Sequence, residues 1–305
     1  MATAHRRLMP EARVTAQAKI NLRLKILARE EEGYHSIETI FARIDLADDV
    51  VIRVGQQGRS IDSHGANLGP VEKNLAYRAA LAYEAATGWP DTFAIEITKR
   101  IPVGGGLGGG SADAGAVLRA LDVLAPHPVG PRLPALAAEL GADVPFMTLD
   151  APFALGWSRG ERLFVLPTLP WHSIVVVTPD HGIATSESYE WVAASRRMSG
   201  AIPKVGFTPT AFIIEAAAVR DWDRMAAIAR NDFDAVVFER FPELAKAAAS
   251  LRQHGALISM LAGSGSSVIG VFDAQADAEK ALAASPIHGL LSRTSTNVVG
   301  VATGG

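Results

Sequence analysis

Six glycines fill the seven positions from Gly104 to Gly110, and only Leu107 interrupts them. Glycine loses more backbone freedom on folding than any other residue and gives no side chain to a core. A run this dense predicts that another group approaches the backbone closely. Where such a loop leads into a helix, its unbonded N–H groups and the helix dipole attract anions. The run therefore predicts a phosphate-binding loop, against the alternative of a tight turn used only for packing.

Two common phosphate-binding patterns do not fit this loop. The GxGxxG spacing that starts at Gly104 would need an acidic residue about 20 positions on at a strand end, but Asp122 falls inside a predicted helix. The GxxxxG spacing that starts at Gly105 is followed by Ser111, where the Walker A motif requires Lys. The loop is expected to hold phosphates by a third scheme. An NAD-dependent oxidoreductase is the alternative, and it would bind NAD in a way that ATP does not displace.

A cationic and an acidic side chain could supply the chemistry. Lys19 and Asn21 lie two apart in 14–27, where apolar and polar residues alternate, so both are expected on one face of a strand. Asp143 lies in a constrained turn that follows Gly141. A carboxylate beside an ammonium can accept a hydroxyl proton and neutralise a transferred phosphoryl group. For Asp143 alone, capping of the following chain is an equally good interpretation.

The elements that would position these residues are strands mixed with helices. Asn74 is suited to cap a helix that Gly88 ends. In the first half the apolar pattern predicts strands at 14–27, 37–46, 50–54 and 93–98 and helices at 74–87, 112–124 and 134–140. In the second half it predicts strands at 162–166, 173–178, 256–261, 268–272 and 296–301 and helices near 185–197, 208–219, 242–254 and 274–284.

This order of elements predicts an α+β fold with two lobes. Residues 1–10 are expected to form a flexible leader, 11–149 the first lobe and 150–305 the second. Loose packing is expected only at 56–70 and 199–209.

Composition excludes several classes of protein. The 305 residues include no cysteine, which rules out disulfides, a thiolate nucleophile and cysteine-ligated metals and favours a cytoplasmic location. A net charge of −3 provides no broad positive field for nucleic acid. No apolar run approaches the roughly 18 residues that a membrane span requires. We expect a monomer or homodimer that binds a small molecule and neither nucleic acid nor a membrane.

The stretch Pro102-Val-Gly-Gly-Gly-Leu-Gly-Gly-Gly-Ser-Ala-Asp-Ala114 resembles the glycine motif of the GHMP kinases, P-x-x-x-G-L-G-G-G-S-S-x-A. Two further stretches, 16–24 and 261–268, resemble the first and third motifs of that family in the expected order. The resemblance implies an ATP-binding N-terminal lobe like domain 2 of ribosomal protein S5 and a ferredoxin-like C-terminal lobe. Ala112 departs from the motif, because the family often has a second Ser there.

Four shorter stretches, 18–22, 33–41, 73–75 and 141–145, are similar to those of GHMP kinases that act on a cytidine diphosphate-linked alcohol. The resemblance implies ATP-dependent phosphorylation of the 2-hydroxyl of such an alcohol in isoprenoid precursor biosynthesis. The alternatives are a GHMP kinase for homoserine, mevalonate or a sugar, and a non-catalytic nucleotide-binding relative.

The resemblance also implies the roles of single residues. Asp143 is expected to be the catalytic base and Lys19 its partner. Mg²⁺ is expected with the nucleotide, and Ser111 is its expected protein ligand, since no carboxylate cluster has metal-binding spacing. ATP is expected at Asn74, Leu75, Lys99, Pro102, Val103, Gly104, Gly105, Gly106, Leu107, Gly108, Gly109, Gly110, Ser111 and Ala112.

The cytidine-linked substrate is expected to bind residues from both halves of the chain. Tyr34 or Phe41 would offer an aromatic face to cytosine. From position alone, His35 would equally be a surface histidine, and the loop that contains Gly263 a plain hairpin turn. The full set of expected contacts is Asn21, Tyr34, His35, Phe41, Thr185, Gly263, Ser264 and Gly265.

Overall fold

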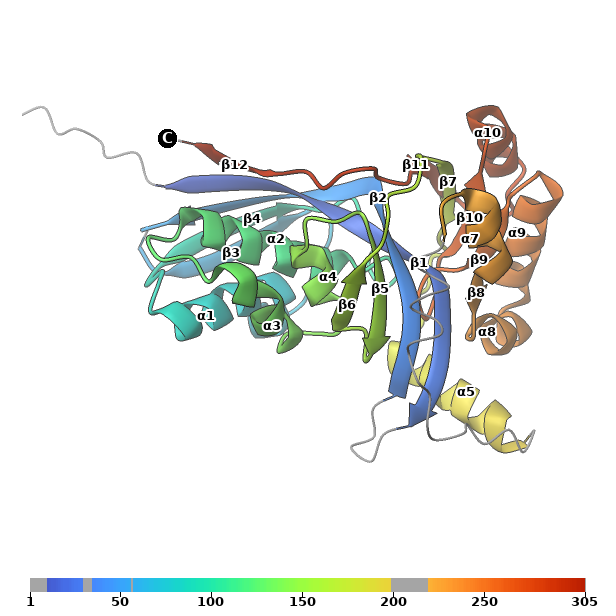
Figure 1. Cartoon of the computed structure of the whole chain (residues 1–305), viewed down its shortest axis with the longest axis horizontal. Helices are drawn as coiled ribbons and strands as arrows, with labels where there is room; N and C mark the ends of the chain where they lie inside the picture. Colours follow the sequence, from blue (N-terminus) through green and yellow to red (C-terminus); the bar gives the residue numbers. More distant parts are fainter. Residues whose placement is uncertain (1–9, 30–34, 56, 199–218, 305) are drawn as a thin grey trace, which may run out of the picture.

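The computed structural model describes residues 10–29, 35–55, 57–198 and 219–304. In these residues the chain forms two β-sheets with helices packed against them, which confirms the predicted α+β fold (Figure 1). The larger sheet has strand order β12-β1-β2-β4-β3, with β5 and β6 continuing from β2 and β8 pairing with β1. The smaller sheet has the order β11-β7-β10-β9 and is antiparallel.

The long strands β1 and β2 dominate the larger sheet and run from the left side of the view, beside β12, down to α5 at the bottom (Figure 1). They pair along most of their length, and the prediction of a strand at 14–27 is confirmed. The strands of this sheet are β1 (Glu11–Arg29), β2 (His35–Val54), β3 (Arg59–His64), β4 (Phe93–Thr98), β5 (Phe153–Ser158), β6 (Arg162–Val165), β8 (Arg230–Asn231) and β12 (Val301–Gly304).

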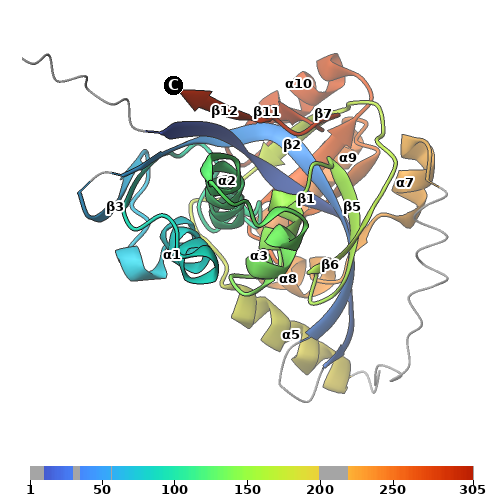
Figure 2. The same ribbon diagram turned by 60° about the vertical axis from the view of Figure 1, so that its left-hand side comes forward.

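Helices cover one face of this sheet, and α2 lies directly against β1 and β2 (Figure 2). The predicted cap is confirmed, because Asn74 Oδ1 accepts from the N–H groups of Ala76 at 2.9 Å and Tyr77 at 3.4 Å. Gly88, with φ 75°, ends the helix as predicted. The helices of this lobe are α1 (Leu75–Thr87), α2 (Gly109–Leu124), α3 (Leu133–Ala138) and α4 (Val144–Thr148), with 3₁₀ turns at Val71–Lys73 and Gly130–Arg132.

The second lobe is built around the smaller sheet. Its strands are β7 (Ser173–Val177), β9 (Ile258–Leu261), β10 (Val268–Phe272) and β11 (Gly289–Arg293). Its described helices are α5 (Thr185–Met198), α7 (Trp222–Ile228), α8 (Asp234–Arg240), α9 (Pro242–Gln253) and α10 (Gln275–Ala283). The predicted helices near 185–197, 242–254 and 274–284 and the predicted strands at 173–178, 256–261 and 268–272 are confirmed to within two residues, and the predicted helix at 208–219 lies outside the described residues except for Val219.

The predicted break between strands at 47–49 is wrong, because β2 continues through it. In the structure the Asp48 carboxylate is fully buried and accepts from Lys99 Nζ and from the backbone N–H of Ile101 at 2.9 Å. A satisfied carboxylate can stay inside a sheet, so the strand needs no turn there.

The predicted loose segment 56–70 contains β3, which pairs in parallel with β4. Most side chains of β3 are exposed, so its hydrogen bonds to β4 rather than burial of its side chains hold it as a strand. The sequence also missed β5, whose first four residues are all buried and therefore do not alternate. The strands β8 and β11 and the helices α7 and α8 were not predicted. The predicted strand at 296–301 is wrong except at its last residue, because β12 covers Val301–Gly304.

The two sheets do not divide at residue 149. β5 and β6 extend the larger sheet beyond this point, and β12 returns to pair with β1 (Figure 1). Of the predicted leader only Pro10 is described, and its carbonyl accepts from the N–H of Val54 at 3.1 Å. Among the described helices none is both long enough and apolar enough to cross a membrane.

Candidate active site

The glycine run forms the junction between β4 and α2. Gly104, Gly106 and Gly108 have φ of 75°, 76° and 70°, which disfavours any residue with a side chain. A Cβ at Gly106 would overlap the carbonyl oxygen of Ala262 in the second lobe. One at Gly108 would lie 3.0 Å from Lys19 Cε. Part of the close approach that the sequence predicted is thus made by the protein itself.

The end of the run faces outward. Helix α2 begins at Gly109 with Gly108 as its N-cap, and glycine has no side chain to bond the first-turn N–H groups. Gly110 is exposed and Ser111 half-buried. These first-turn N–H groups are therefore available to an anion, and the helix dipole adds to the attraction. The helix starts three residues earlier than the sequence predicted, inside the glycine run.

Lys19 lies at the centre of the candidate site. Its ammonium contacts Asp143 Oδ2 at 3.2 Å and donates to Asn21 Oδ1 at 2.8 Å and to the Gly106 carbonyl at 3.1 Å. The Lys19 side chain is 4% exposed, whereas that of Asp143 is 31% exposed. The ammonium is therefore enclosed, while the carboxylate beside it can meet a ligand.

Irregular pairing of β1 with β2 brackets this lysine. The register shifts between Gln17 and Lys19 and again between Asn21 and Arg23. Such irregularities bend a strand and redirect its side chains. Here the Lys19 N–H donates to the Leu107 carbonyl at 3.0 Å, so backbone and side chain of one residue both hold the glycine loop.

Asp143 immediately precedes α4 but makes no side-chain cap bond to it. The capping interpretation is therefore wrong, and the carboxylate instead pairs with Lys19. The sequence separates these two residues by more than a hundred positions, and only the fold brings them together.

A loop of the second lobe closes the other side of the site. A Cβ at Gly263 would lie 3.0 Å from the Gly106 carbonyl and 3.3 Å from Lys19 Nζ. The Ser264 hydroxyl lies 3.0 Å from Thr185 Oγ1, which joins the loop to the start of α5. Asn231, which sequence reasoning missed, donates from Nδ2 to the Gly263 carbonyl at 2.7 Å. The loop is therefore more than a plain hairpin turn.

Several predicted substrate contacts are placed differently or not described. Asn21 is 1% exposed, and both ends of its amide bond to the protein. Phe41 is fully buried and stacks on Phe146 with ring centroids 4.9 Å apart, so it offers no open face to a base. Tyr34 and the side chain of His35 lie outside the described residues.

Tyr189 of α5 is an aromatic residue that the sequence did not indicate, and the charge of Asp143 acts on it. Burial, and then the charge of Asp143, raise the pKa of Tyr189 to about 12. Its ring packs edge-on against Phe233, with centroids 5.0 Å apart. The Asp143 charge therefore acts on Tyr189, a half-buried residue of the neighbouring lobe.

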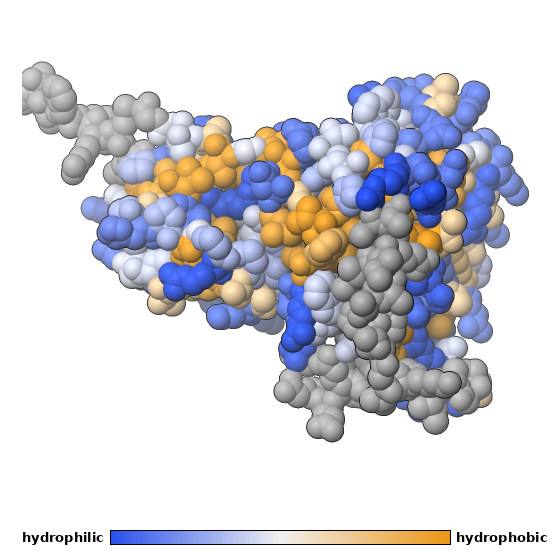
Figure 3. All heavy atoms as spheres, viewed as in Figure 1, coloured by the Kyte–Doolittle hydropathy of each residue, from blue (hydrophilic) through white to orange (hydrophobic). Residues whose placement is uncertain are grey.

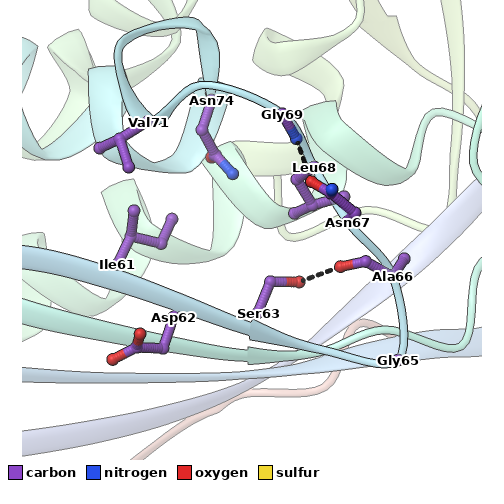
Figure 4. Close-up of a pocket in the computed structure, with 10 residues that line it drawn as sticks. All are labelled: Ile61, Asp62, Ser63, Gly65, Ala66, Asn67, Leu68, Gly69, Val71 and Asn74. Atoms are coloured by element: carbon purple, nitrogen blue, oxygen red, sulfur yellow. Dashed lines mark hydrogen bonds between the residues drawn. The ribbon is translucent and has the colours of Figure 1, made fainter.

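A pocket of about 500 Å³ lies beside the N-terminus of α1 (Figure 4). Its lining comes from β3, from the loop that follows it and from the start of α1: Ile61, Asp62, Ser63, Gly65, Ala66, Asn67, Leu68, Gly69, Val71 and Asn74. Leu75, the next residue, would contact a Cβ at Gly110 with its Cδ1 at 3.6 Å. The pocket and the first turn of α2 are thus neighbours, as a base and its phosphates would require.

Lys99 does not border this pocket with its ammonium, which was one interpretation of its place before the loop. The side chain is 4% exposed and lies between Asp48 and Asp113, with Asp113 Oδ2 at 2.7 Å. Burial raises the pKa of Asp113 to about 7, with the Asp48 charge adding to this effect and the Lys99 charge opposing it. The cluster of Lys99, Asp48 and Asp113 lies against the end of the glycine loop, since a Cβ at Gly109 would lie 3.3 Å from Lys99 Nζ.

The donor set for a metal ion is small. No group of three His, Asp or Glu side chains gathers anywhere in the described part of the chain. Asp113, the acidic residue nearest the loop in sequence, bonds inward to Lys99. The Ser111 hydroxyl in the first turn of α2 is compatible with Mg²⁺ that takes most of its ligands from phosphate oxygens and water.

Comparisons with known proteins agree with this geometry. The model of the GHMP kinases N terminal domain matches residues 74–151, and that of the GHMP kinases C terminal domain matches residues 213–289. The 4-diphosphocytidyl-2-C-methyl-D-erythritol kinase of Solibacter usitatus (strain Ellin6076) is 40% identical over 86% of this chain and 81% of its own. The enzyme of the same name from Moorella thermoacetica is 38% identical over 84% of this chain and 88% of its own.

Solved structures are similar over nearly the whole chain. A crystal structure of 4-(cytidine 5'-diphospho)-2C-methyl-D-erythritol kinase has a TM-score of 0.73 and 33% identity, covering 93% of this chain and 99% of that one. Homoserine kinase from Cytophaga hutchinsonii has a TM-score of 0.71 at 18% identity, covering 99% of this chain and 100% of that one. The second likeness concerns the fold alone.

Proposed function

The chain belongs to the GHMP kinase family, and from this premise we propose that it phosphorylates the 2-hydroxyl of 4-diphosphocytidyl-2-C-methyl-D-erythritol with ATP. It is a phosphotransferase with an alcohol acceptor, and it acts in non-mevalonate isoprenoid precursor biosynthesis. The observation that carries the proposal is the Lys19–Asp143 pair, held at 3.2 Å beside the glycine loop. The products are ADP and the 2-phosphate of the acceptor.

In the proposed reaction Asp143 accepts the proton of the 2-hydroxyl as its oxygen bonds to the γ-phosphorus. The bond between that phosphorus and the β,γ-bridging oxygen breaks, and ADP leaves with the electron pair. Lys19 fixes the position of the carboxylate and adds positive charge near the transferred group. Because Lys19 also donates to the Gly106 carbonyl, it links the proposed base to the glycine loop.

The nucleotide is proposed to lie across the two features that adjoin at Leu75. Its phosphates would meet the first-turn N–H groups of α2, and its base would enter the pocket beside Asn74. Mg²⁺ would neutralise phosphate charge, with the Ser111 hydroxyl as protein ligand. The proposal places the enzyme in the cytoplasm as a monomer or homodimer.

The test is ADP release by the purified protein with ATP and Mg²⁺ and a panel of acceptor alcohols. We expect turnover with the cytidine diphosphate-linked methylerythritol and none with homoserine, mevalonate or a hexose. Turnover with another member of the panel and not with the cytidine-linked acceptor would contradict the proposed substrate. ATP binding without turnover on any acceptor would indicate a non-catalytic relative instead.

Asp143→Ala tests the proposed base. We expect kcat to fall by roughly 10² to 10⁴, because the hydroxyl proton loses its acceptor, while the Kd for ATP stays nearly unchanged. Asp91→Ala removes an exposed carboxylate outside the site and is the control, with wild-type kcat expected. An unchanged kcat in Asp143→Ala would leave this residue a structural role only.

A further inference from the structure

The hydrogen bond that Thr39 of β2 donates to the Arg23 carbonyl determines which groups are donors and which are acceptors in the bonds of Asn21. The residue is 0% exposed, and its hydroxyl donates to the Arg23 carbonyl at 2.8 Å. A hydroxyl has a single proton, so towards Asn21 the oxygen of Thr39 can only accept. Asn21 Nδ2 donates to it at 2.7 Å. The amide nitrogen of Asn21 is therefore held at Thr39.

This arrangement turns the other end of the Asn21 amide to the catalytic lysine. Asn21 Oδ1 accepts from Lys19 Nζ at 2.8 Å, and an ammonium can only donate. The ammonium thus donates hydrogen bonds to Asn21 Oδ1 and to the Gly106 carbonyl and forms an ion pair with Asp143 Oδ2. Each bond from the Arg23 carbonyl to the Lys19 ammonium thus has one possible direction.

We propose that Thr39 is a positioning residue for catalysis, which holds Lys19 in place through Asn21. The inference rests on the proposed function, because it assigns Lys19 to the kinase reaction. The hydrogen bonds of the Thr39 hydroxyl go to Asn21 and to the Arg23 carbonyl, and not to Asp143 or the glycine loop. Thr39 therefore acts on the reaction through Lys19. Asn21 has the same task rather than serving mainly as a substrate contact.

The chain of bonds has a clear weak point. Without the Thr39 hydroxyl, the buried N–H of Asn21 loses its acceptor, and a buried unsatisfied donor is unfavourable. The amide then gains by rotating toward another acceptor, which removes one of the three restraints on Lys19. A shift of the ammonium moves the carboxylate of Asp143 relative to the phosphate loop, and small displacements of this kind lower the rate of the chemical step.

Two comparisons isolate the Thr39 hydroxyl: wild type with Thr39→Val, and Thr39→Ser with Thr39→Ala. Thr39→Val keeps the branched shape of threonine without its hydroxyl, and Thr39→Ser keeps the hydroxyl without the methyl. Thr39→Ala shares the missing methyl of Thr39→Ser, so the Ser and Ala variants also differ in the hydroxyl alone. Each is assayed for kcat, for KM of ATP and of the acceptor, and for thermal unfolding temperature. If Thr39→Val does not fold, the comparison of Ser with Ala still measures the hydroxyl.

We expect kcat to fall by roughly 10- to 100-fold in Thr39→Val and Thr39→Ala, with KM for ATP within about twofold of wild type. Thr39→Ser should restore most of the rate. Thr294→Val is the matched control, because Thr294 is also buried and its hydroxyl accepts from the His172 N–H at 2.8 Å. It should lower the unfolding temperature and leave kcat unchanged.

Equal kcat within each pair would overturn the positioning role, as would a loss of rate in Thr294→Val as large as in Thr39→Val. The wild-type assay separates this test from that of the function. A wild type that turns over another acceptor contradicts the proposed substrate, and the Thr39 comparison is then made with that acceptor. A wild type with no turnover on any acceptor contradicts both.

Discussion

At the scale of single residues, the site depends on charges that the fold has enclosed. The Lys99 ammonium lies between Asp48 and Asp113, and Asp113 Oδ1 has no hydrogen-bond partner among the described residues. Burial raises the pKa of Asp113 to about 7 against the pull of Lys99. The Asp113 carboxyl therefore keeps its proton to a higher pH than an exposed aspartate does.

The raised pKa of Asp113 makes stability depend on pH. Between about 4 and about 7 the folded protein keeps a proton on Asp113 that the unfolded chain has released. This part of the free energy of unfolding is present below pH 4 and is lost as pH rises to about 7. We expect Asp113→Asn to make the free energy of unfolding less dependent on pH in this window, as measured by urea denaturation at several pH values.

The same experiment has an internal comparison in the second lobe. Burial also raises the pKa of Asp234 to about 7, so a residual decrease with pH should persist in Asp113→Asn. Asp91→Asn, at an exposed position, should follow the wild-type curve. A curve for Asp113→Asn that coincides with wild type would show that Asp113 titrates normally.

At the scale of elements, the glycine run serves two neighbours. Its middle packs against the loop after β9, where Ser267 N–H donates to the Gly105 carbonyl at 3.2 Å. Its end forms the open N-terminus of α2. The glycine run therefore fixes both the exposed N-terminus of α2 and a contact between the lobes.

Gly104 and Gly106 test whether the glycine run packs tightly against the second lobe, because their φ angles are almost equal but the room for a Cβ differs. Gly104 and Gly106 have φ of 75° and 76°, so Ala at either position meets a backbone cost of about 1–2 kcal/mol. The nearest atom to a Cβ at Gly104 is 3.8 Å away, whereas one at Gly106 would overlap the Ala262 carbonyl. We expect Gly106→Ala to lower the free energy of unfolding by about 1–3 kcal/mol more than Gly104→Ala, and to abolish kinase activity.

The comparison uses urea denaturation and the ADP-release assay on both variants. Equal losses of stability in the two would mean that the loop does not pack tightly against the second lobe in solution.

The start of α1 offers a second test at this scale. Asn74 caps the helix with Oδ1 and also lines the pocket proposed for the base. We expect Asn74→Ala to lower the free energy of unfolding by about 1 kcal/mol, because two first-turn N–H groups lose their acceptor. Asn74→Asp keeps a capping oxygen and should retain stability.

Nucleotide binding then distinguishes the cap from the pocket. If the side chain of Asn74 serves only as a cap, Asn74→Asp should also keep the wild-type Kd for ATP, measured by calorimetry. A weaker Kd at unchanged stability would assign the amide a direct contact with the nucleotide. Loss of stability in Asn74→Asp as large as in Asn74→Ala would contradict the capping role.

At the scale of the whole molecule, the lobes share a core. Ile174, Met260 and Ile269 of the second sheet belong to one buried cluster with Ile20 and Ile40 of the first. The other face of the second sheet packs on the helices of its lobe in a second cluster, which also includes Leu24 and Ile26 of β1 and Ile37 of β2. On the surface, polar residues cover most of the face in view and hydrophobic residues gather near α4 and β5 (Figure 3). The continuous core predicts that the lobes unfold together.

Ile269→Ala tests that coupling. Ile269 is fully buried in the shared cluster, and its truncation should lower the free energy of unfolding by about 2–5 kcal/mol. The transitions followed by far-ultraviolet circular dichroism and by tryptophan fluorescence should still coincide, since tryptophans occur in both lobes. A first transition confined to one probe would show that the lobes unfold separately.

Much of the local structure could be predicted from the sequence. The alternation from 14 to 27 predicted β1, Asn74 and Gly88 predicted the limits of α1, and the glycine run predicted a loop that leads into a helix. These features depend on residues a few positions apart, so their pattern is visible in the chain. Strand β5, whose first four residues are buried on both faces, and the mostly exposed edge strand β3 show no clear alternation of apolar and polar residues, so the sequence did not predict them.

The site divides in the same way. The sequence by itself determined that a glycine-rich loop leading into a helix, a lysine on a strand and an aspartate in a turn are present. Only the tertiary structure decided that Lys19 meets Asp143, that Gly106 yields space to Ala262 and that Thr39 supports Asn21. The reason is physical: strand pairing in the larger sheet brings Thr39 to Asn21, packing within the first lobe brings Asp143 to Lys19, and packing between the lobes brings Ala262 to Gly106, and none of these contacts follows from a local preference of the chain.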